Sequence, residues 1–535
     1  MKNIFHFTPQ EDYQFSIQNP NMPEAPKYTK EDTLKSSLEA NLMMMQEIFH
    51  YPVTSDFKIR TIQITINEVS YAGALFFYDG MVDANAINDT LLKPLLMPFS
   101  YQTNSLLKSL SKEDLQHALL EKVLYQCQLD TSSYFFKVID SVNHGECVLM
   151  VDQLDVAFLI DLKKIPGRSV EKSENEMTLK GPSESFIENL RTNTALIRKF
   201  VKDENLIFEN SEIGTKSKTK CAIAYISNIT NDSIIAEVKR RIQNVSIDHL
   251  IDIGELEQLI EDKTFILNPL ILSTERPDKV ASGLLEGRVA ILLEGSPNAL
   301  IVPVVFTDFT HSSEDTYLRH PYAMLLRIFR IPAIILSVFL PGIYIAITTF
   351  HQEMIPTDLL LAIAGTREKV PFPMLIELLI METAFEIIRE ASIRTPAPVG
   401  PTLGIVGTLI LGQAIVSANI VSPILIIIVA LTGISAFAIA NLSLSYSFRI
   451  ARFFYIFLGG ILGFFGIALG IFSHAVILSN VSSFGVPYLT PFSPIRKGAL
   501  KDDLFISPLW KQEKRPIFLR PKQKQREPKI SRKWL

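Results

Sequence analysis

The sequence predicts an α/β region of two subdomains followed by an α-helical domain that crosses a membrane several times. Two observations predict this division. Asp, Glu, Lys and Arg are spread through residues 1–330, whereas none of the four occurs from 395 to 448 or from 453 to 495. Mean hydropathy is +0.22 although 20% of the residues are charged, because a polar half is averaged with an apolar half. These values exclude a wholly soluble chain, a disordered chain and a disulfide scaffold.

Five parts are expected along the 535 residues. They are a flexible leader (1–30), α/β subdomain 1 (31–165), α/β subdomain 2 (166–320), a transmembrane domain (321–490) and a basic polar tail (491–535). The net charge of −4 gives no bulk attraction to nucleic acid, so no nucleic-acid partner is expected. The leader lacks the apolar run of a secretory signal, which favours a cytoplasmic N-terminal region.

Alternation of apolar and polar residues predicts the strands of both subdomains. In subdomain 1 the expected strands are FKIRTIQITI, AGALFFYDG, YFFKVID, CVLMVDQ and VAFLIDL, and Asp83 is expected to cap a helix. In subdomain 2 we expect helices over 183–201 and IIAEVKRRIQNV, and strands AIAYISNI, VAILLEG and ALIVPVVF. Strands interleaved with helices indicate two sheets with helical cover.

Four apolar stretches are long enough to cross about 30 Å of hydrocarbon. They lie near 331–350, 402–420, 423–442 and 453–478. Basic residues between 319 and 330 and in the tail favour placing both on the cytoplasmic side. With four spans, residues 319–330 and the tail both lie on the cytoplasmic side, but Arg449 and Arg452 lie outside. A fifth crossing by the amphipathic helix 374–394 would place these two arginines inside and the tail outside. We favour four spans with 374–394 as an interfacial or vestibule helix.

The helix 374–394 carries the first candidate site. Glu377, Glu382 and Glu386 lie along it at helical spacing. A carboxylate is costly in hydrocarbon, so these groups are expected to face water, headgroups or a protein cavity. One interpretation is a vestibule that favours cations when several subunits assemble. The other is an interfacial helix in which Glu386 and Arg389 form a solvated pair.

A second candidate site is a stripe on the span 402–420. At helical spacing one face carries Thr402, Val406, Leu409, Gln413 and Ser417. This stripe can line a narrow, mostly apolar pore. Packing between helices explains the small and polar residues equally well.

No catalytic constellation is present in the sequence. It contains no phosphate-binding loop, no HExxH motif and no GxSxG motif. Cys127, Cys147 and Cys221 are far apart and are expected to be reduced packing residues. We therefore expect no enzyme, no cofactor and no metal site.

Several long segments resemble the A-subunit family of spore germinant receptors, the GerA-type spore germination proteins. In the α/β region they are YDGMVD (78–83), GPSESFIENLRTNTALIR (181–198), RPD (276–278) and LLEGRVAILLEGSPNALIVP (284–303). In the apolar half they are HQEMIPTDLLLAIAGTREKVPFP (351–373), ELLIMETAFEIIREASIR (377–394) and PTLGIVGTLILGQAIVSANIVSP (401–423). The resemblance covers roughly residues 35–490 and does not include the leader or the tail.

The resemblance implies a multi-pass protein of the spore inner membrane. It implies a transporter-like B subunit that senses the nutrient and a lipoprotein C subunit as partners. The A subunits are expected to form a homo-oligomer in membrane lipid that acts as a nutrient-gated cation channel. Candidates for subunit contact are Phe186, Asn189, Arg191, Arg276 and Asp278, with ordinary core packing as the alternative. A non-conducting scaffold that docks the B subunit is the alternative function.

Overall fold

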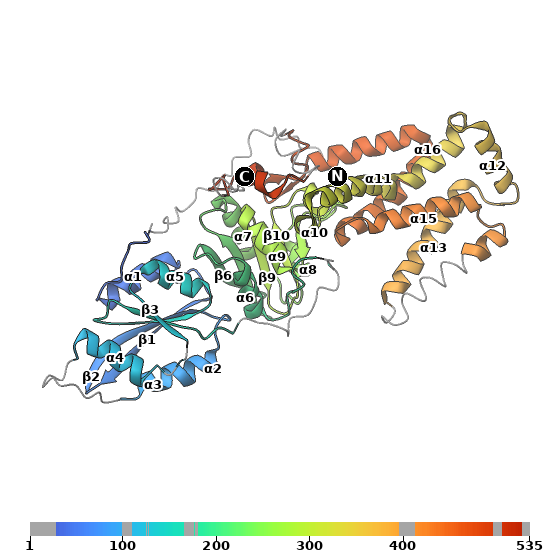
Figure 1. Cartoon of the computed structure of the whole chain (residues 1–535). Coiled ribbons are helices and arrows are strands. Elements are labelled where there is room, and N and C mark those ends of the chain that lie inside the picture. Colours follow the sequence, from blue (N-terminus) through green and yellow to red (C-terminus); the bar gives the residue numbers. More distant parts are fainter. Residues whose placement is uncertain are drawn as a thin grey trace.

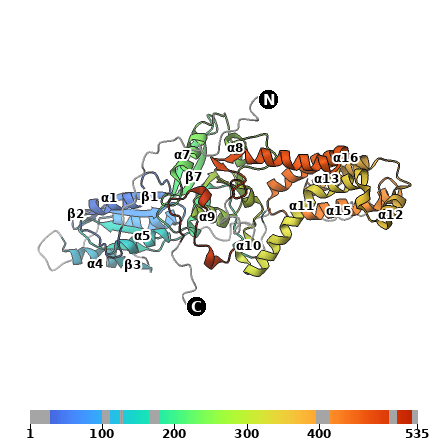
Figure 2. The same ribbon diagram turned by 90° about the horizontal axis from the view of Figure 1, so that it is seen from above.

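The protein consists of three units arranged in a row. The computed structural model describes residues 28–98, 110–124, 126, 128–164, 176, 180–394, 412–495 and 506–526. Figure 1 shows subdomain 1 (28–164), subdomain 2 (180–317) and the helical region (320–479) following one another, and Figure 2 shows the same order from above. We call the end of the helical region that contacts subdomain 2 its near end and the opposite end its far end.

Subdomain 1 is a five-stranded antiparallel sheet covered on both faces. Its strand order is β1-β2-β4-β5-β3. The strands are β1 (Phe57–Ile66), β2 (Val69–Tyr78), β3 (Leu129–Ser132), β4 (Cys147–Val151) and β5 (Ala157–Ile160). Helices α1 (Leu38–Ile48) and α5 (Phe135–Asn143) pack on one face, and α3 (Lys93–Leu96) and α4 (Lys112–Lys122) pack on the other. Between β2 and α3 lie α2 (Ala84–Ala86) and the π-helix η1 (Ile87–Leu92).

Subdomain 2 repeats this arrangement. Its strand order is β6-β7-β9-β10-β8, the same order displaced by five strands. The strands are β6 (Leu206–Ile213), β7 (Thr219–Ile226), β8 (Leu272–Thr274), β9 (Val289–Leu293) and β10 (Ala299–Val302). Helices α6 (Leu190–Phe200) and α9 (Pro277–Glu286) cover one face, and α7 (Asp232–Gln243) and α8 (Ile253–Ile260) cover the other. The two-sheet prediction for the N-terminal region is therefore confirmed.

Two element predictions are wrong. Residues 134–140 were expected to form a strand, but they begin helix α5, in which Phe135, Val138, Ile139 and Val142 are buried. This spacing of three and four is helical, and it outweighs the strand preference of the aromatic and β-branched residues. The helix expected over 183–201 begins only at Leu190, because Asn189 caps it by accepting a hydrogen bond from the Thr192 N–H. The expected cap at Asp83 is confirmed.

A buried ion pair joins the two subdomains. Arg198 of α6 donates to both carboxylate oxygens of Asp56, next to β1, and both side chains are almost fully buried. The guanidinium also lies 3.7 Å from the centre of the Tyr78 ring and donates to the Leu206 carbonyl at 2.9 Å. Because these partners belong to both subdomains, the pair fixes their relative orientation.

Subdomain 2 and the helical region share one continuous apolar core. This core extends from α6 and α9 to residues such as Phe448 and Tyr455 of the helical region. At its edge Asp315 of α10 (Glu314–Tyr317) pairs with Arg330 at 2.9 Å and with Arg327 at 3.5 Å. Burial alone would raise the pKa of the Asp315 carboxyl, but the two arginines lower it below its ordinary value.

The helical region is built from five described helices and a short segment. The helices are α11 (His320–Phe350), α12 (Thr357–Arg367), α13 (Met374–Arg394), α15 (Pro423–Phe437) and α16 (Leu442–Ser479), and residues 412–417 are also helical. Among the described residues, α11 and α16 are long and apolar enough to cross a membrane, and α15 is a shorter apolar helix. Most of the expected span 402–420 lies outside the described residues.

The last expected span is two helices instead of one. At Gly463 the backbone has φ 62° and ψ −144°, which breaks α16. The Tyr455 hydroxyl and His474 Nδ1 are 3.4 Å apart, whereas 19 residues of straight helix would separate them by about 28 Å. The two halves of α16 therefore lie side by side as a hairpin, and hydropathy alone could not reveal this because both halves are equally apolar.

The hairpin returns the chain to the α/β region. After the short strands β11 (Ser482–Ser483) and β12 (Val486–Pro487), residues 506–526 pack on subdomain 2. Lys522 Nζ pairs with Asp232 at 2.6 Å, and Arg515 Nε donates to the Leu285 carbonyl at 2.8 Å. The described part of the tail thus lies at the same end of the helical region as both subdomains (Figure 1).

Candidate functional site

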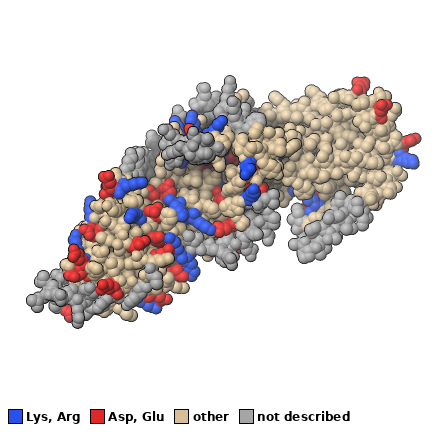
Figure 3. All heavy atoms as spheres, in the orientation of Figure 1, with Lys and Arg blue, Asp and Glu red and all other residues tan. Residues whose placement is uncertain are grey.

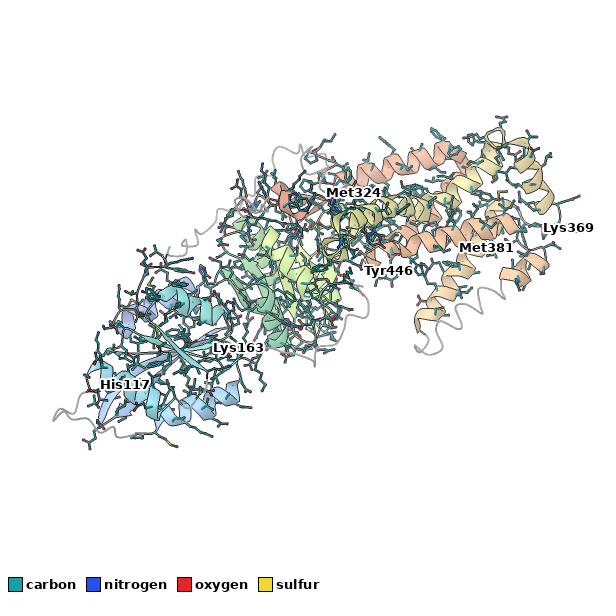
Figure 4. All side chains as sticks on the ribbon, viewed as in Figure 1. His117, Lys163, Met324, Lys369, Met381 and Tyr446 are labelled. Carbon is teal, nitrogen blue, oxygen red and sulfur yellow. The ribbon has the colours of Figure 1, made fainter. Side chains whose placement is uncertain are left out.

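Charged side chains are gathered inside the helical region, although the visible surface of that region is almost uncharged. Figure 3 shows this face as mostly tan, with acidic and basic groups at the far end. Figure 4 shows Met381 of α13 within the helical region and Lys369 at its far tip. The candidate site is the set of glutamates on α13 with the arginines that face them.

The central pair of this site is Glu382 with Arg452. The Arg452 NH1 and a Glu382 oxygen are 2.8 Å apart, and the two side chains are 1% and 0% exposed. Arg452 Nε also donates to the Ser337 carbonyl of α11 at 2.8 Å. One guanidinium thus joins α13, α16 and α11. Charge is tolerated here because each ion has a partner of opposite sign.

Glu386 lies one turn further along α13 and faces two arginines. Arg449 of α16 donates to it at 3.0 Å, and Arg389 of α13 approaches it at 3.8 Å. Arg389 also lies 4.8 Å from the centre of the Phe437 ring of α15. The Glu386–Arg389 contact is therefore not a fully solvated pair, since the two side chains are 25% and 12% exposed.

Glu377 lies near the far end and is fully buried. It accepts a hydrogen bond from the Ser422 N–H at 2.5 Å and faces Arg367 at 3.6 Å. Ser422 precedes the first residue of α15, and the N-terminus of a helix favours a negative charge. Glu377 thus holds the start of α15 against the start of α13.

The three glutamates expected to line a vestibule therefore lie between helices of one chain. In addition, α13 buries Leu378 and Met381 against α15 and α16. A helix with this packing belongs to the bundle and does not lie free on its surface. The arrangement orients helices by ion pairs, and among the described residues no group of His, Cys, Asp and Glu could hold a metal ion.

Only part of the expected pore stripe can be placed. Thr402, Val406 and Leu409 lie outside the described residues. Gln413 and Ser417 lie on the short helix 412–417, and both are exposed in the single chain. They are uncharged polar side chains on a short helix whose other described residues are apolar or small.

The expected subunit-contact residues make contacts within the chain. Phe186 belongs to the core of subdomain 2, and Asn189 caps α6. Arg276 and Asp278 form a buried pair at 2.8 Å. Arg191 is half exposed and pairs with Asp79 of subdomain 1.

A family model for the Bacillus/Clostridium GerA spore germination protein matches residues 43–518. The chain belongs to the GerA family. Spore germination protein KA of Bacillus subtilis (strain 168) is 40% identical over 479 residues, covering 90% of this chain and 86% of the relative. Spore germination protein GerLA of Bacillus cereus is 35% identical over 471 residues, covering 87% of this chain and 94% of the relative.

The chain is also similar to a solved structure. It is the N-terminal domain of the A subunit of the Bacillus megaterium spore germinant receptor GerK3, at 30% identity and a TM-score of 0.39. The match covers 51% of this chain and 98% of that structure. The family model and these two relatives place the chain in a spore germination family, which is not a known enzyme family.

The partners of Glu377, Glu382 and Glu386 were not predicted from the sequence. In the sequence Arg449 and Arg452 bear only on the orientation of the spans, and nothing marks Arg367 as a partner of Glu377. The available signal was the number of charges, because the four glutamates of α13 require cations and few arginines interrupt the apolar half. The Ser337 carbonyl could not be predicted, because every helix has backbone carbonyls.

Proposed function

We propose that this chain is the A subunit of a nutrient germinant receptor in the spore inner membrane. In this proposal several copies assemble into a nutrient-gated cation channel whose opening triggers germination. A transporter-like B subunit and a lipoprotein C subunit complete the receptor, and the B subunit senses the nutrient. Membership of the germination family supports the receptor role.

The exposed side chains of Gln413 and Ser417 carry the channel part of the proposal. An amide and a hydroxyl facing lipid would lack hydrogen-bond partners, which is costly in hydrocarbon. Assembly of several copies around this face would give them water or a neighbouring subunit. In the proposed pore, Thr402, Val406 and Leu409 continue the same helical face as Gln413 and Ser417.

In this proposal the buried ion pairs support the pore without lining it. The Glu382–Arg452 pair holds α13 to α16, and Glu377 holds the start of α15. The glutamates expected to form a vestibule, Glu377, Glu382 and Glu386, thus fix the helices that precede and follow the pore segment. The vestibule role remains a prediction, and it is restricted to Glu386, because Glu386 is the most exposed of the three glutamates.

Substitutions along the pore face test the channel. We expect Val406→Ala or Leu409→Ala to widen an apolar constriction, so that spores release cations without nutrient. We expect Gln413→Leu to reduce nutrient-evoked cation release severalfold. The measurement is potassium release from purified spores with and without nutrient.

Ile427→Ala is the matched control, because Ile427 is a 65% exposed apolar residue of α15 outside the stripe. It is expected to leave cation release unchanged. Normal dormancy and a normal nutrient response for every variant from 402 to 417 would contradict the pore and favour the non-conducting scaffold that docks the B subunit.

The side of the membrane on which each end lies gives a second prediction. Because residues 506–526 pack on subdomain 2, we expect an even number of crossings, with the N-terminal region and the tail on the same side. Epitope tags at the two termini should therefore be protected together in intact cells. A tag inserted after Glu353, at the far end, should be accessible from the other side. Accessibility of the C-terminal tag without the N-terminal tag would contradict this topology.

A further inference from the structure

A loop of subdomain 2 presents apolar side chains at the near end of the helical region. Phe265 is 103% exposed and Leu267 is 44% exposed, although both are large apolar residues. Lys263 and Thr264 in the same loop are also exposed. We call residues 263–267 the α8–β8 loop, after the elements that flank it. In water such a loop would be expected to fold its phenyl ring against the protein.

Hydrogen bonds anchor the α8–β8 loop and the residue that follows it to both halves of α16. The Leu267 carbonyl accepts from the Ser447 hydroxyl in the first half. Asn268 Oδ1 lies 3.1 Å from His474 Nε2 in the second half. Lys263 Nζ donates to the Asn480 carbonyl at 3.1 Å, just after the second half ends. The loop is therefore fastened at both ends while the Phe265 ring projects.

The preceding residue strengthens this anchor. Asp262 pairs with Arg241 of α7 at 2.9 Å and accepts a hydrogen bond from the Phe484 N–H at 2.9 Å. The Arg241 guanidinium also lies 4.1 Å from the centre of the Phe484 ring. The loop that exposes the Phe265 ring is therefore anchored on subdomain 2 as well as on α16.

The position of the α8–β8 loop along the axis of α16 indicates which surroundings contact its exposed side chains. Ser447 lies close to the start of α16 and just before Arg449 and Arg452, after which no Asp, Glu, Lys or Arg occurs until 496. From this level toward the far end the exposed side chains on the first half of α16 include Tyr446, Ile450 and Phe454, spaced by four residues. Figure 4 shows Tyr446 where the helical region meets subdomain 2. Tyr and Trp are enriched at the boundary between lipid headgroups and hydrocarbon, and Tyr446 at this level is consistent with such a boundary.

We propose that the α8–β8 loop inserts Phe265 and Leu267 into the headgroup boundary of a phospholipid bilayer, beside the near end of α16. The inference rests on the proposed membrane embedding of the helical region, and it adds a contact made by the α/β region itself. Lys263 flanks the inserted residues and suits the phosphate groups of the lipid. Since the loop is tied to both halves of α16, insertion holds subdomain 2 at a fixed height above the bilayer.

Depth-dependent quenching of tryptophan fluorescence tests the proposal. The full chain, with Trp510→Phe and Trp534→Phe, is reconstituted into vesicles of phosphatidylethanolamine and phosphatidylglycerol that contain brominated acyl chains. Three variants each carry one new tryptophan, Phe265→Trp in the loop, Phe454→Trp on α16 and Tyr134→Trp in subdomain 1. We expect Phe265→Trp to be quenched severalfold more strongly than Tyr134→Trp, most strongly by bromine near the headgroups. Acrylamide in the water should quench Tyr134→Trp more than Phe265→Trp.

The two controls separate the possible failures. In one outcome, brominated lipid quenches Phe454→Trp but quenches Phe265→Trp no more than Tyr134→Trp. This result would overturn insertion of the loop and leave the membrane embedding of the helices intact. Protection of Phe265→Trp from both acrylamide and brominated lipid would also overturn it, because a second protein surface would then cover the loop. Absence of quenching at Phe454→Trp would contradict the membrane embedding itself and the loop proposal with it.

Discussion

Replacing Glu382 by alanine is expected to destabilise the helical region by about 3–5 kcal/mol, because Arg452 would remain buried without a counterion. The effect is large since the pair is inaccessible to water and water therefore cannot replace the lost carboxylate. Arg452→Ala should cost a similar amount and should also release the Ser337 carbonyl from its hydrogen bond. The measurement is the free energy of unfolding of the full chain in mild detergent titrated with sodium dodecyl sulfate.

Two further variants show whether the loss comes from an unpaired charge. The double variant Glu382→Leu with Arg452→Met removes both charges and should recover most of the stability, because an apolar pair of similar size avoids the desolvation cost. Glu353→Ala at the exposed far end should change the free energy of unfolding by no more than about 0.5 kcal/mol. A double variant as unstable as Glu382→Ala would show that volume, and not charge, supports the packing there.

The local pattern of the sequence was sufficient for most of the α/β region. Strand β1 was predicted with its observed bounds, because apolar and polar residues alternate along most of FKIRTIQITI. Helix α5 was missed because a short apolar run fits both periods until its buried positions are known. The repeat of strand order between the subdomains could not be predicted from the sequence, because pairing between distant strands leaves no local pattern.

The candidate site was predicted as a set of residues but not as a geometry. Three of the four glutamates of α13 could be identified because a carboxylate in an apolar stretch needs a partner. Ser422 is 45 residues from Glu377 in the sequence, and Arg452 is 70 residues from Glu382. Only the fold brings these partners together. The hairpin in α16 was missed for a related reason, since Gly463 is one of several glycines in the segment and its positive φ becomes visible only in the structure.

The contact between α11 and α16 depends on two glycines, Gly342 of α11 and Gly459 of α16. A Cβ atom added at Gly459 would lie 2.5 Å from the Gly342 carbonyl oxygen of α11. A Cβ atom added at Gly342 would lie 2.7 Å from the Tyr455 carbonyl oxygen of α16. Both obstacles are backbone atoms, which a side-chain rotation cannot move. The two helices therefore approach so closely only because both positions lack a side chain.

We expect Gly459→Ala to destabilise the helical region by about 1–3 kcal/mol, and Gly459→Leu to cost more because it forces the helices further apart. Separation of α11 from α16 would also draw Arg452 away from the Ser337 carbonyl, so the packing change should weaken the ion-pair site. The control is Gly365→Ala in α12, where an added Cβ meets nothing within 4 Å. It should be neutral or stabilise by about 0.5–1 kcal/mol, since alanine is the better helix former. Equal free energies of unfolding for Gly459→Ala and Gly365→Ala would contradict the close backbone approach as the basis of this contact.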